Sequence, residues 1–262
     1  MIIIKLGGSA LTVKDASTPT LDEENLDRIA SEVSYYNDDM IIVHGAGSYG
    51  HIYADEYKIG DVITNANEHL RRIEGVCKTQ TSVQQLNHDI CQKLQQKGIP
   101  AITIKPSSFI VTNQKRIAVC DTTIIKQYLE NGFVPVLYGD AVLDMDEDIK
   151  FAIISGDQII TYLAYDLKAD RVILASDVDG IYTDNPKTNP EAKLIDEVTQ
   201  DTQLNTTSNE NMADVTGGMN GKIQELLKLA ENNIQSQIIN AQTPGNIQKA
   251  VSGQNVKGTI IK

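Results

Sequence analysis

The stretch HGAGSYGH at residues 44–51 limits what this chain can fold into more than any other part of the sequence. It follows the apolar residues 40–43, which predict a short buried strand, and it leads into residues 51–58, for which we predict a helix. Its three glycines let the backbone turn tightly and approach a ligand without a Cβ in the way. Backbone N–H groups and a helix N-terminus would then point at one place, which favours an anion site, most simply a phosphate site.

His51 closes this loop on the first turn of the predicted helix, where its imidazole can donate a hydrogen bond to a phosphate oxygen. The loop by itself is equally compatible with an ordinary glycine-rich turn whose histidine caps the helix or packs against it. Further loops of similar chemistry elsewhere in the chain favour the phosphate site.

The composition is that of an ordinary soluble globular protein, with 41% hydrophobic and 22% charged residues among 262. A net charge of −12 argues against a nucleic-acid binder, which needs a basic face. An anionic substrate must therefore be held by a few local positive groups and backbone amides. The N-terminus has no signal-peptide pattern and no apolar run approaches the ~20 residues of a membrane span, so we expect a cytoplasmic protein without membrane contacts.

The sequence predicts no metal-binding cluster of side chains. The three cysteines and four histidines lack metal-ligand spacing, and we expect the cysteines to be reduced structural thiols. The acidic turn at residues 144–148 lacks the spacing and the glycine of a calcium loop, so we interpret it as a solvated hairpin tip.

A second glycine turn follows the apolar strand predicted at residues 2–6. Gly7, Gly8 and Ser9 form this turn, and Lys5 and Lys14 flank it. The spacing is not that of a P-loop. Both lysines are within reach of a transferring phosphoryl group, although either one taken alone is typical of a solvated surface.

Three more segments of this kind lie in the second half of the chain. Residues 155–157 (SGD) begin a predicted helix, residues 176–180 (SDVDG) follow a predicted strand, and residues 216–222 (TGGMNGK) open another helix. Taken singly, Asp157 is typical of a helix N-cap, and Asp177 and Asp179 are typical turn formers.

Strands alternate with helices along the chain, which predicts an α/β fold with a mostly parallel sheet covered on both faces. Ligands in such folds gather at the C-terminal ends of the strands, so the glycine turns should converge on one edge of one sheet. The pattern also predicts a helix begun by a capping box at residues 20–23 and a long helix over residues 66–97. On the long helix, Arg71 and Arg72 either point at a substrate phosphate or, as we prefer, at water.

In their order and spacing, these five motifs resemble the amino acid kinase superfamily, and the resemblance covers nearly the whole chain. Two positions depart from the usual pattern, since Ala46 stands where many members have glycine and Tyr49 where many have phenylalanine. Alanine adds only a methyl group, so the loop keeps its geometry if Ala46 does not need a positive φ. The resemblance implies a three-layer αβα sandwich in a single domain over residues 1–262, with an acceptor lobe at 1–154 and an ATP lobe at 155–262.

The resemblance also implies phosphoryl transfer from ATP, for which a protein supplies mainly positioning and positive charge. Lys5 and Lys222 would bridge the ATP phosphates, Lys14 would stabilise the transferring group, and Asp157 would order the lysines. Mg²⁺ would bridge the β- and γ-phosphates, without a dedicated carboxylate cage. The residues expected at ATP are Lys5, Gly7, Gly8, Ser9, Gly47, Asp157, Asp177, Asp179, Tyr182, Lys187, Gly217 and Lys222.

On the acceptor side, the resemblance implies that His51 contacts the acceptor phosphate and that Ala46, Gly47 and Gly139 line its pocket, with His44 as a structural donor. The implied reaction converts isopentenyl phosphate to isopentenyl diphosphate for isoprenoid synthesis, with the apolar tail in the helical region 53–97. Alternatives are a kinase for another small phosphate or phosphonate such as fosfomycin, or an inactive nucleotide-binding regulatory module. Homodimers are common in the superfamily, and we expect one here.

Overall fold

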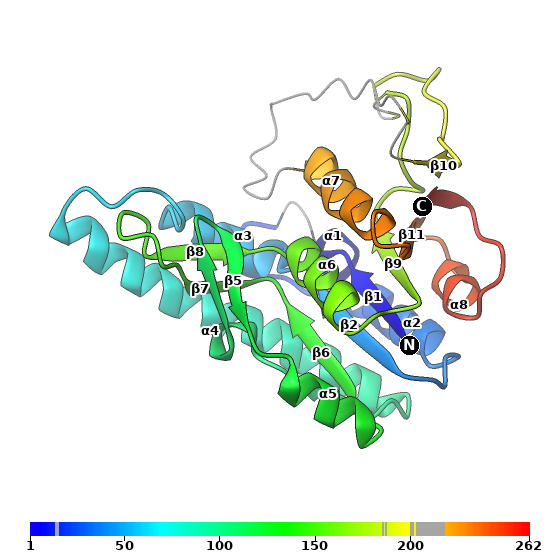
Figure 1. The fold of residues 1–262 in the computed structure, drawn as a ribbon, viewed down its shortest axis with the longest axis horizontal. Coiled ribbons are helices and arrows are strands. Elements are labelled where there is room, and N and C mark those ends of the chain that lie inside the picture. Colours follow the sequence, from blue (N-terminus) through cyan, green and yellow to red (C-terminus); the bar gives the residue numbers. More distant parts are fainter. Residues whose placement is uncertain (14–15, 185, 187, 200–201, 203–217) are drawn as a thin grey trace.

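The computed structural model describes residues 1–13, 16–184, 186, 188–199, 202 and 218–262. Its main feature is an eight-stranded sheet with the strand order β10-β12-β11-β9-β1-β2-β6-β3 (Figure 1). The strands of this sheet are β1 (Ile2–Leu6), β2 (Met40–His44), β3 (Ala101–Thr103), β6 (Val134–Tyr138), β9 (Arg171–Ser176), β10 (Glu197–Val198), β11 (Gln235–Asn240) and β12 (Gly258–Ile261).

The sheet is mostly parallel, as the sequence predicts. Only β11 and β12 pair in the antiparallel sense among the described strands of this sheet. The central strand β1 lies between β2 and β9, so that Ile4 pairs with Ile42 on one side and with Ile173 on the other. All five residues of β1 are buried because helices cover both faces of the sheet, which explains the continuous apolar run.

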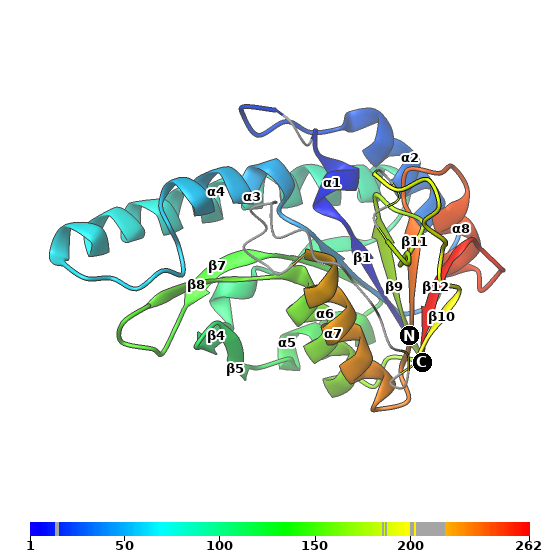
Figure 2. The ribbon, with the colours of Figure 1, turned by 90° about the horizontal axis from the view of Figure 1, so that it is seen from above.

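Helices form the two outer layers (Figure 2). The described helices are α1 (Gly8–Leu11), α2 (Glu23–Val33), α3 (Gly47–Glu56), α4 (Ala66–Gln96), α5 (Thr123–Glu130), α6 (Gly156–Asp166), α7 (Gly218–Ala230) and α8 (Asn246–Val251), with a 3-10 turn at Pro106–Ser108. Ile2, Ile4 and Leu6 of β1 pack with α2, α4 and α8 on one face. Ile3 packs with α5, α6 and α7 on the other. The predicted αβα sandwich is confirmed.

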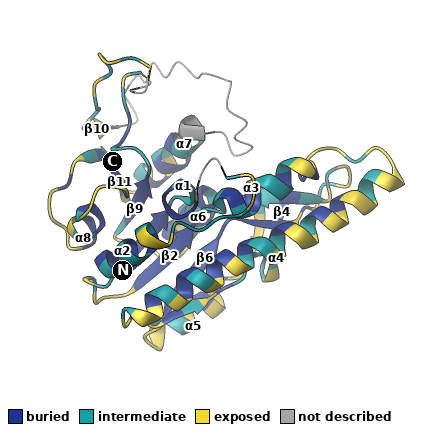
Figure 3. Cartoon of the chain, turned by 180° about the vertical axis from the view of Figure 1, so that it is seen from behind, coloured by how far each residue is buried: buried dark blue, intermediate teal, exposed yellow. Residues whose placement is uncertain are grey.

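Two antiparallel hairpins stand outside the main sheet. The first pairs β4 (Ile110–Asn113) with β5 (Arg116–Cys120), and the second pairs β7 (Asp140–Leu143) with β8 (Phe151–Ile154). The long helix α4 packs beside β7 with its N-terminal half and against the core with its C-terminal half (Figure 3). None of the described helices is both long enough and apolar enough to cross a membrane.

Several local predictions were wrong. Helix α2 begins after Asp22, whose side chain accepts a hydrogen bond from the Asn25 amide, so the capping box at residues 20–23 does not form. Helix α3 begins at Gly47 and not at residue 51. Strand β10 was not predicted, because two residues are too short a run to carry a periodic signal.

Two charged residues expected in water are buried. Arg72 is 6% exposed and donates to the Tyr57 carbonyl oxygen, while Arg71 stays exposed and donates to the Glu56 carbonyl oxygen. Both arginines thus bind the C-terminal end of α3. Asp144, predicted at a solvated hairpin tip, is 7% exposed and accepts hydrogen bonds from the tip of the other hairpin.

Candidate active site

The loops that follow β1 and β2 touch each other backbone to backbone at the C-terminal edge of the sheet. The Gly7 amide donates to the Ala175 carbonyl oxygen at 2.7 Å, and the Gly45 amide donates to the Leu6 carbonyl oxygen at 2.9 Å. A Cβ added to Gly8 would lie 2.4 Å from the Gly47 amide nitrogen, a distance that real Cβ atoms do not reach. Glycine is therefore required at this contact because no side chain fits between the two loops.

The N-termini of α1 and α3 meet at this contact. Gly47 has φ +50°, a left-handed conformation that favours glycine, whereas Ala46 has φ −73°. The condition under which Ala46 preserves the loop is thus met. The Thr12 hydroxyl joins the two loops, since it accepts from the Ser48 amide at 3.2 Å and donates to the Gly8 carbonyl oxygen at 2.9 Å. The N-cap residue Ala46 supplies no side-chain acceptor of its own, and the dipole of α3 favours an anion at this end.

A buried ion pair lies at the same edge. The Lys5 ammonium at the end of β1 is 2.5 Å from Asp157 Oδ1 in the first turn of α6, and both side chains are at most 10% exposed. The N-cap of α6 is Ser155, whose hydroxyl accepts from the Gln158 amide, so the N-cap interpretation of Asp157 is wrong. A Cβ on Gly156 would lie 3.2 Å from Lys5 Cε, and glycine there leaves room for the lysine.

Gly139 closes the same edge from the end of β6. Its amide donates to the His44 carbonyl oxygen at 3.1 Å, and a Cβ there would lie 3.5 Å from the Gly156 amide nitrogen. Gly139 therefore lies beside Gly156, the residue that precedes Asp157. Ser9 lies in α1, one residue after the Gly8 contact.

His44 is buried behind the glycine loop and is held on both sides of its ring. Its Nδ1 contacts the Gly45 carbonyl oxygen at 3.0 Å, and its Nε2 contacts the Asn87 side-chain amide at 3.1 Å. Its ring stacks on Tyr138 with centroids 5.3 Å apart. Burial lowers the pKa of His44 from 6.5 to about 4, against the opposing effect of the Gly45 carbonyl. His44 is therefore neutral at pH 7 and donates from Nδ1, as a structural donor should.

His51 is exposed on α3, the helix that also contributes Tyr53 to a small apolar cluster. It is the fifth residue of this helix and so lies beyond the first turn in which it was predicted. The cluster consists of Tyr57, Ile59 and Ala141, against which Tyr53, Val76, Phe151 and Ile153 pack only partly buried. These side chains come from α3, α4, the segment that joins these two helices, β7 and β8. An exposed histidine and a partly open apolar cluster thus both follow the glycine loop along the chain.

The residues predicted at the ribose side make contacts with one another. The Asp179 carboxylate accepts from Tyr182 Oη at 3.1 Å, from the Asn240 amide at 2.9 Å and from the Lys257 ammonium at 2.5 Å. These hydrogen bonds, with that from Lys257 first, lower the pKa of Asp179. Asp177 is half-buried at the end of β9 and accepts from the Ser176 hydroxyl. Asp179 and Tyr182 thus order their own loop, which agrees with the alternative interpretation of Asp179 as a turn former.

Lys222 is half-buried on α7, which packs beside α6, the helix that carries Asp157. Lys14, Lys187 and Gly217 lie outside the described residues. The described part of the chain has no group of three or more His, Cys, Asp or Glu side chains able to hold a metal ion.

Comparison with known proteins decides the family. The model of the amino acid kinase family matches residues 1–240. The chain belongs to the amino acid kinase family.

Its similar relatives include two archaeal isopentenyl phosphate kinases. The one from Methanothermobacter thermautotrophicus is 49% identical over 262 residues, covering 100% of this chain and 98% of that protein. The one from Methanocaldococcus jannaschii is 38% identical over 271 residues, with 100% and 98% covered. A solved isopentenyl phosphate kinase structure has a TM-score of 0.91 and 47% identity, with 100% of both chains covered. A UMP kinase from Ureaplasma parvum, at 20% identity and a TM-score of 0.62, shares the fold.

Sequence reasoning missed two residues that contact the glycine loops of this amino acid kinase family member, Asn87 and Thr12. Asn87 is 0% exposed on α4 among Val83, Leu86 and Ile90, where the helical period predicts an apolar residue. A buried polar residue at such a position needs a partner. That signal was present in the sequence and points to a contact behind the glycine loop.

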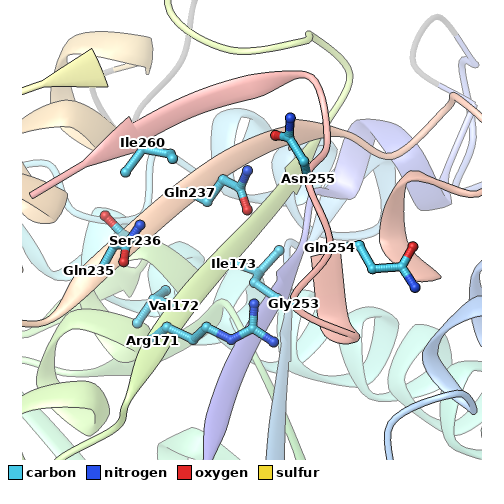
Figure 4. A pocket seen from close by; sticks show the side chains of 10 residues that line it. All are labelled: Arg171, Val172, Ile173, Gln235, Ser236, Gln237, Gly253, Gln254, Asn255 and Ile260. Atoms are coloured by element: carbon cyan, nitrogen blue, oxygen red, sulfur yellow. The ribbon is translucent and has the colours of Figure 1, made fainter. Parts of the chain in front are cut away.

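A cavity of about 340 Å³ lies away from this site (Figure 4). It is lined at the N-terminal ends of β9 and β11 by Arg171 and several amide side chains, including Gln235, Gln237 and Gln254. The Arg171 guanidinium is already bound to the carbonyl oxygens of Ala250 and Val251 at the end of α8. Since Ser176 ends β9 at the opposite edge, this cavity is separate from the glycine loops.

The backbone contact between the glycine loops predicts that substitutions at two neighbouring glycines differ in their effect on the free energy of unfolding. Gly8→Ala forces the two backbones apart, and we expect it to lower the free energy of unfolding by about 2–3 kcal/mol, the cost of overpacking a close contact. Gly7→Ala is the matched control, because its Cβ comes no nearer than 3.1 Å to another atom, the Ala175 carbonyl oxygen. Urea unfolding of both variants measures the difference, and equal losses would contradict the contact.

The neutral His44 predicts a pH dependence of stability. In the unfolded chain this histidine binds a proton below pH 6.5, whereas in the folded protein it does so only below about 4. Its contribution is therefore complete above pH 6.5 and decreases as the pH falls toward 4. Between pH 7.5 and pH 5, we expect the wild-type protein to lose about 2 kcal/mol more unfolding free energy than His44→Asn. Urea unfolding at both pH values tests this, and equal losses in the two proteins would refute it.

Proposed function

We propose that this chain transfers the γ-phosphoryl group of ATP to isopentenyl phosphate, giving isopentenyl diphosphate and ADP. The observation that carries the proposal is full-length similarity to proteins named isopentenyl phosphate kinase, at 49% and 38% identity. The HGAGSYGH loop, with its helix N-terminus and His51, supports a phosphate as the acceptor group. Fosfomycin and a purely regulatory role are not favoured, since neither is named among these relatives.

On the acceptor side, the phosphate of isopentenyl phosphate would bind at the N-terminus of α3, where the helix dipole favours an anion. His51 would donate a hydrogen bond to a phosphate oxygen. The apolar tail would pack on the cluster around Tyr53, Val76 and Phe151, which is only partly buried by the protein itself. This arrangement gives the two ends of the acceptor separate polar and apolar surroundings.

On the donor side, Lys5 would contact the ATP phosphates while Asp157 holds its ammonium in place. An oxygen of the acceptor phosphate attacks the γ-phosphorus, the bond to the β-phosphate oxygen breaks, and ADP leaves with the electron pair. The protein contributes positioning and fixed positive charge, which is what a loose phosphoryl-transfer transition state requires. Lys14 and Lys222 would add to this charge, with Gly7, Gly8, Ser9, Gly47 and Gly217 supplying amides.

The donor set fits a metal that arrives with the nucleotide. The described residues offer ammonium and amide donors at this edge and no cluster of carboxylates. Mg²⁺ bound to ATP would neutralise charge on the β- and γ-phosphates. Asp177, Asp179, Tyr182 and Lys187 remain our prediction for the ribose and base side, within an ATP lobe at 155–262 that faces an acceptor lobe at 1–154.

We also propose a cytoplasmic homodimer. Leu70 and Ile73 lie three residues apart on α4 and are 65% and 41% exposed, which supports a contact between copies through this helix (Figure 3).

The proposal predicts ADP release that depends on the acceptor. With purified protein, ATP and Mg²⁺, we expect turnover with isopentenyl phosphate well above that with fosfomycin, UMP or N-acetylglutamate. His51→Ala should lower kcat/KM for isopentenyl phosphate about 10- to 100-fold, the value of one hydrogen bond to a charged group. His88→Ala, which removes an exposed histidine from α4, is the control and should leave kcat/KM unchanged. Preference for another acceptor would refute isopentenyl phosphate as the substrate. An unchanged kcat/KM in His51→Ala would refute the proposed role of His51.

A further inference from the structure

The β4–β5 hairpin has a turn that its own sequence does not favour. Gln114 and Lys115, its two central residues, have φ values of +49° and +64°. Two-residue hairpin turns of this kind usually contain Asn-Gly or Gly-Gly, since other residues are strained at positive φ. Such strain persists only where surrounding contacts hold the backbone in place, and it often marks a segment with a function.

A buried carboxylate from the other hairpin holds this turn. Asp144 Oδ1 accepts from the Gln114 amide at 3.0 Å, and Oδ2 accepts from the Lys115 amide at 2.8 Å and from the Thr112 hydroxyl at 2.7 Å. Burial opposes ionisation of Asp144, but these hydrogen bonds and that of the Asp146 amide outweigh it and lower its pKa. The turn is therefore fixed to the acceptor half of the molecule.

From this fixed position the turn contacts both helices that carry the predicted ATP-side residues. The Lys115 carbonyl oxygen accepts from Gln158 Nε2 at 3.1 Å, and Gln158 follows Asp157 on α6. The Arg116 guanidinium is 2.6 Å from Glu225 Oε1 on α7. Arg116 and Glu225 are 109 residues apart in the sequence, so this ion pair connects distant parts of the chain.

The buried carboxylate of Glu225 depends on its ion pair with Arg116. Its side chain is 9% exposed, and its other oxygen, Oε2, is buried without a hydrogen-bond partner among the residues described. Among the residues that the structure describes, two cations face Oε1, namely Arg116 at 2.6 Å and Lys228 at 3.1 Å, but Lys228 lies on α7 itself. Arg116 is therefore the cation that can fix the rotation of α7 relative to the hairpin. Residues three apart share a helix face, so the rotation that Glu225 sets is also that of Lys222.

We propose that Arg116 is a positioning residue that acts through Glu225 to hold Lys222 in place against the Lys5–Asp157 pair. The strained turn and Asp144 supply the rigid support that lets a surface arginine do this. The inference rests on the proposed function, because it assumes that Lys222 contacts the ATP phosphates.

The chain offers a matched pair of variants. Arg116→Gln and Lys228→Gln each remove one half-exposed cation from Glu225, but only the first cuts the connection to the hairpin. We expect Arg116→Gln to lower kcat/KM for ATP about tenfold, with the KM for isopentenyl phosphate within about twofold of wild type. Lys228→Gln should keep kcat and both KM values within about twofold of wild type. Arg116→Lys should recover part of the loss seen in Arg116→Gln. Equal kinetics of Arg116→Gln and Lys228→Gln would overturn the proposal.

A double-mutant cycle tests whether Arg116 acts through Lys222. In a Lys222→Gln background, we expect Arg116→Gln to change kcat/KM for ATP by less than about twofold, because its target is already gone. Full additivity of the two substitutions would overturn the proposal. Calorimetric titration with ATP and Mg²⁺, without acceptor, separates this inference from the substrate assignment. Weaker ATP binding by Arg116→Gln than by Lys228→Gln supports it even if isopentenyl phosphate is not the acceptor, and equal binding contradicts it.

Discussion

The backbone contact between Gly8 and Gly47 is the constraint on which the rest of the site depends. It brings the turn after β1 against the turn after β2, so that α1 and α3 begin at one point on the edge of the sheet. Any side chain at this contact would separate the two loops. The same approach brings the end of β1, with Lys5, beside the loop that leads to His51. One steric requirement thus places Lys5 and the loop that leads to His51 next to each other.

Positive charge at this edge is local and held by buried groups. The chain carries a net charge of −12, so its overall field repels anions. Lys5 stays in position because Asp157 faces it in a dry environment, where the pair needs no solvent to keep it oriented. Glu225 has the corresponding relation to Arg116 on the neighbouring helix. In both cases a buried carboxylate on a helix faces a cation from a distant part of the chain.

Sequence patterns predicted the elements whose signals are local. Strands β1 and β2 begin with apolar runs, and α4 has an Asn65 cap at its start and Gly98, with φ +83°, just after its end. Predictions failed where a distant contact decides the conformation. Helix α3 begins at Gly47 because the Thr12 hydroxyl accepts a hydrogen bond from the Ser48 amide, 36 residues away in the sequence. Arg72 is buried because the Tyr57 carbonyl at the end of α3 needs a donor.

The sequence by itself determined the family, the αβα architecture and the order of the glycine motifs, because glycine spacing and hydrophobic period are properties of short segments. The resemblance already implied that Asp157 orders the lysines, but only the tertiary structure decided which charged and polar groups lie in contact. Lys5 with Asp157, Asn87 with His44, and Arg116 with Glu225 each join residues far apart in the chain. Their distances follow from the order of strands in the sheet and from the helix faces turned toward it, and a local pattern does not encode either one.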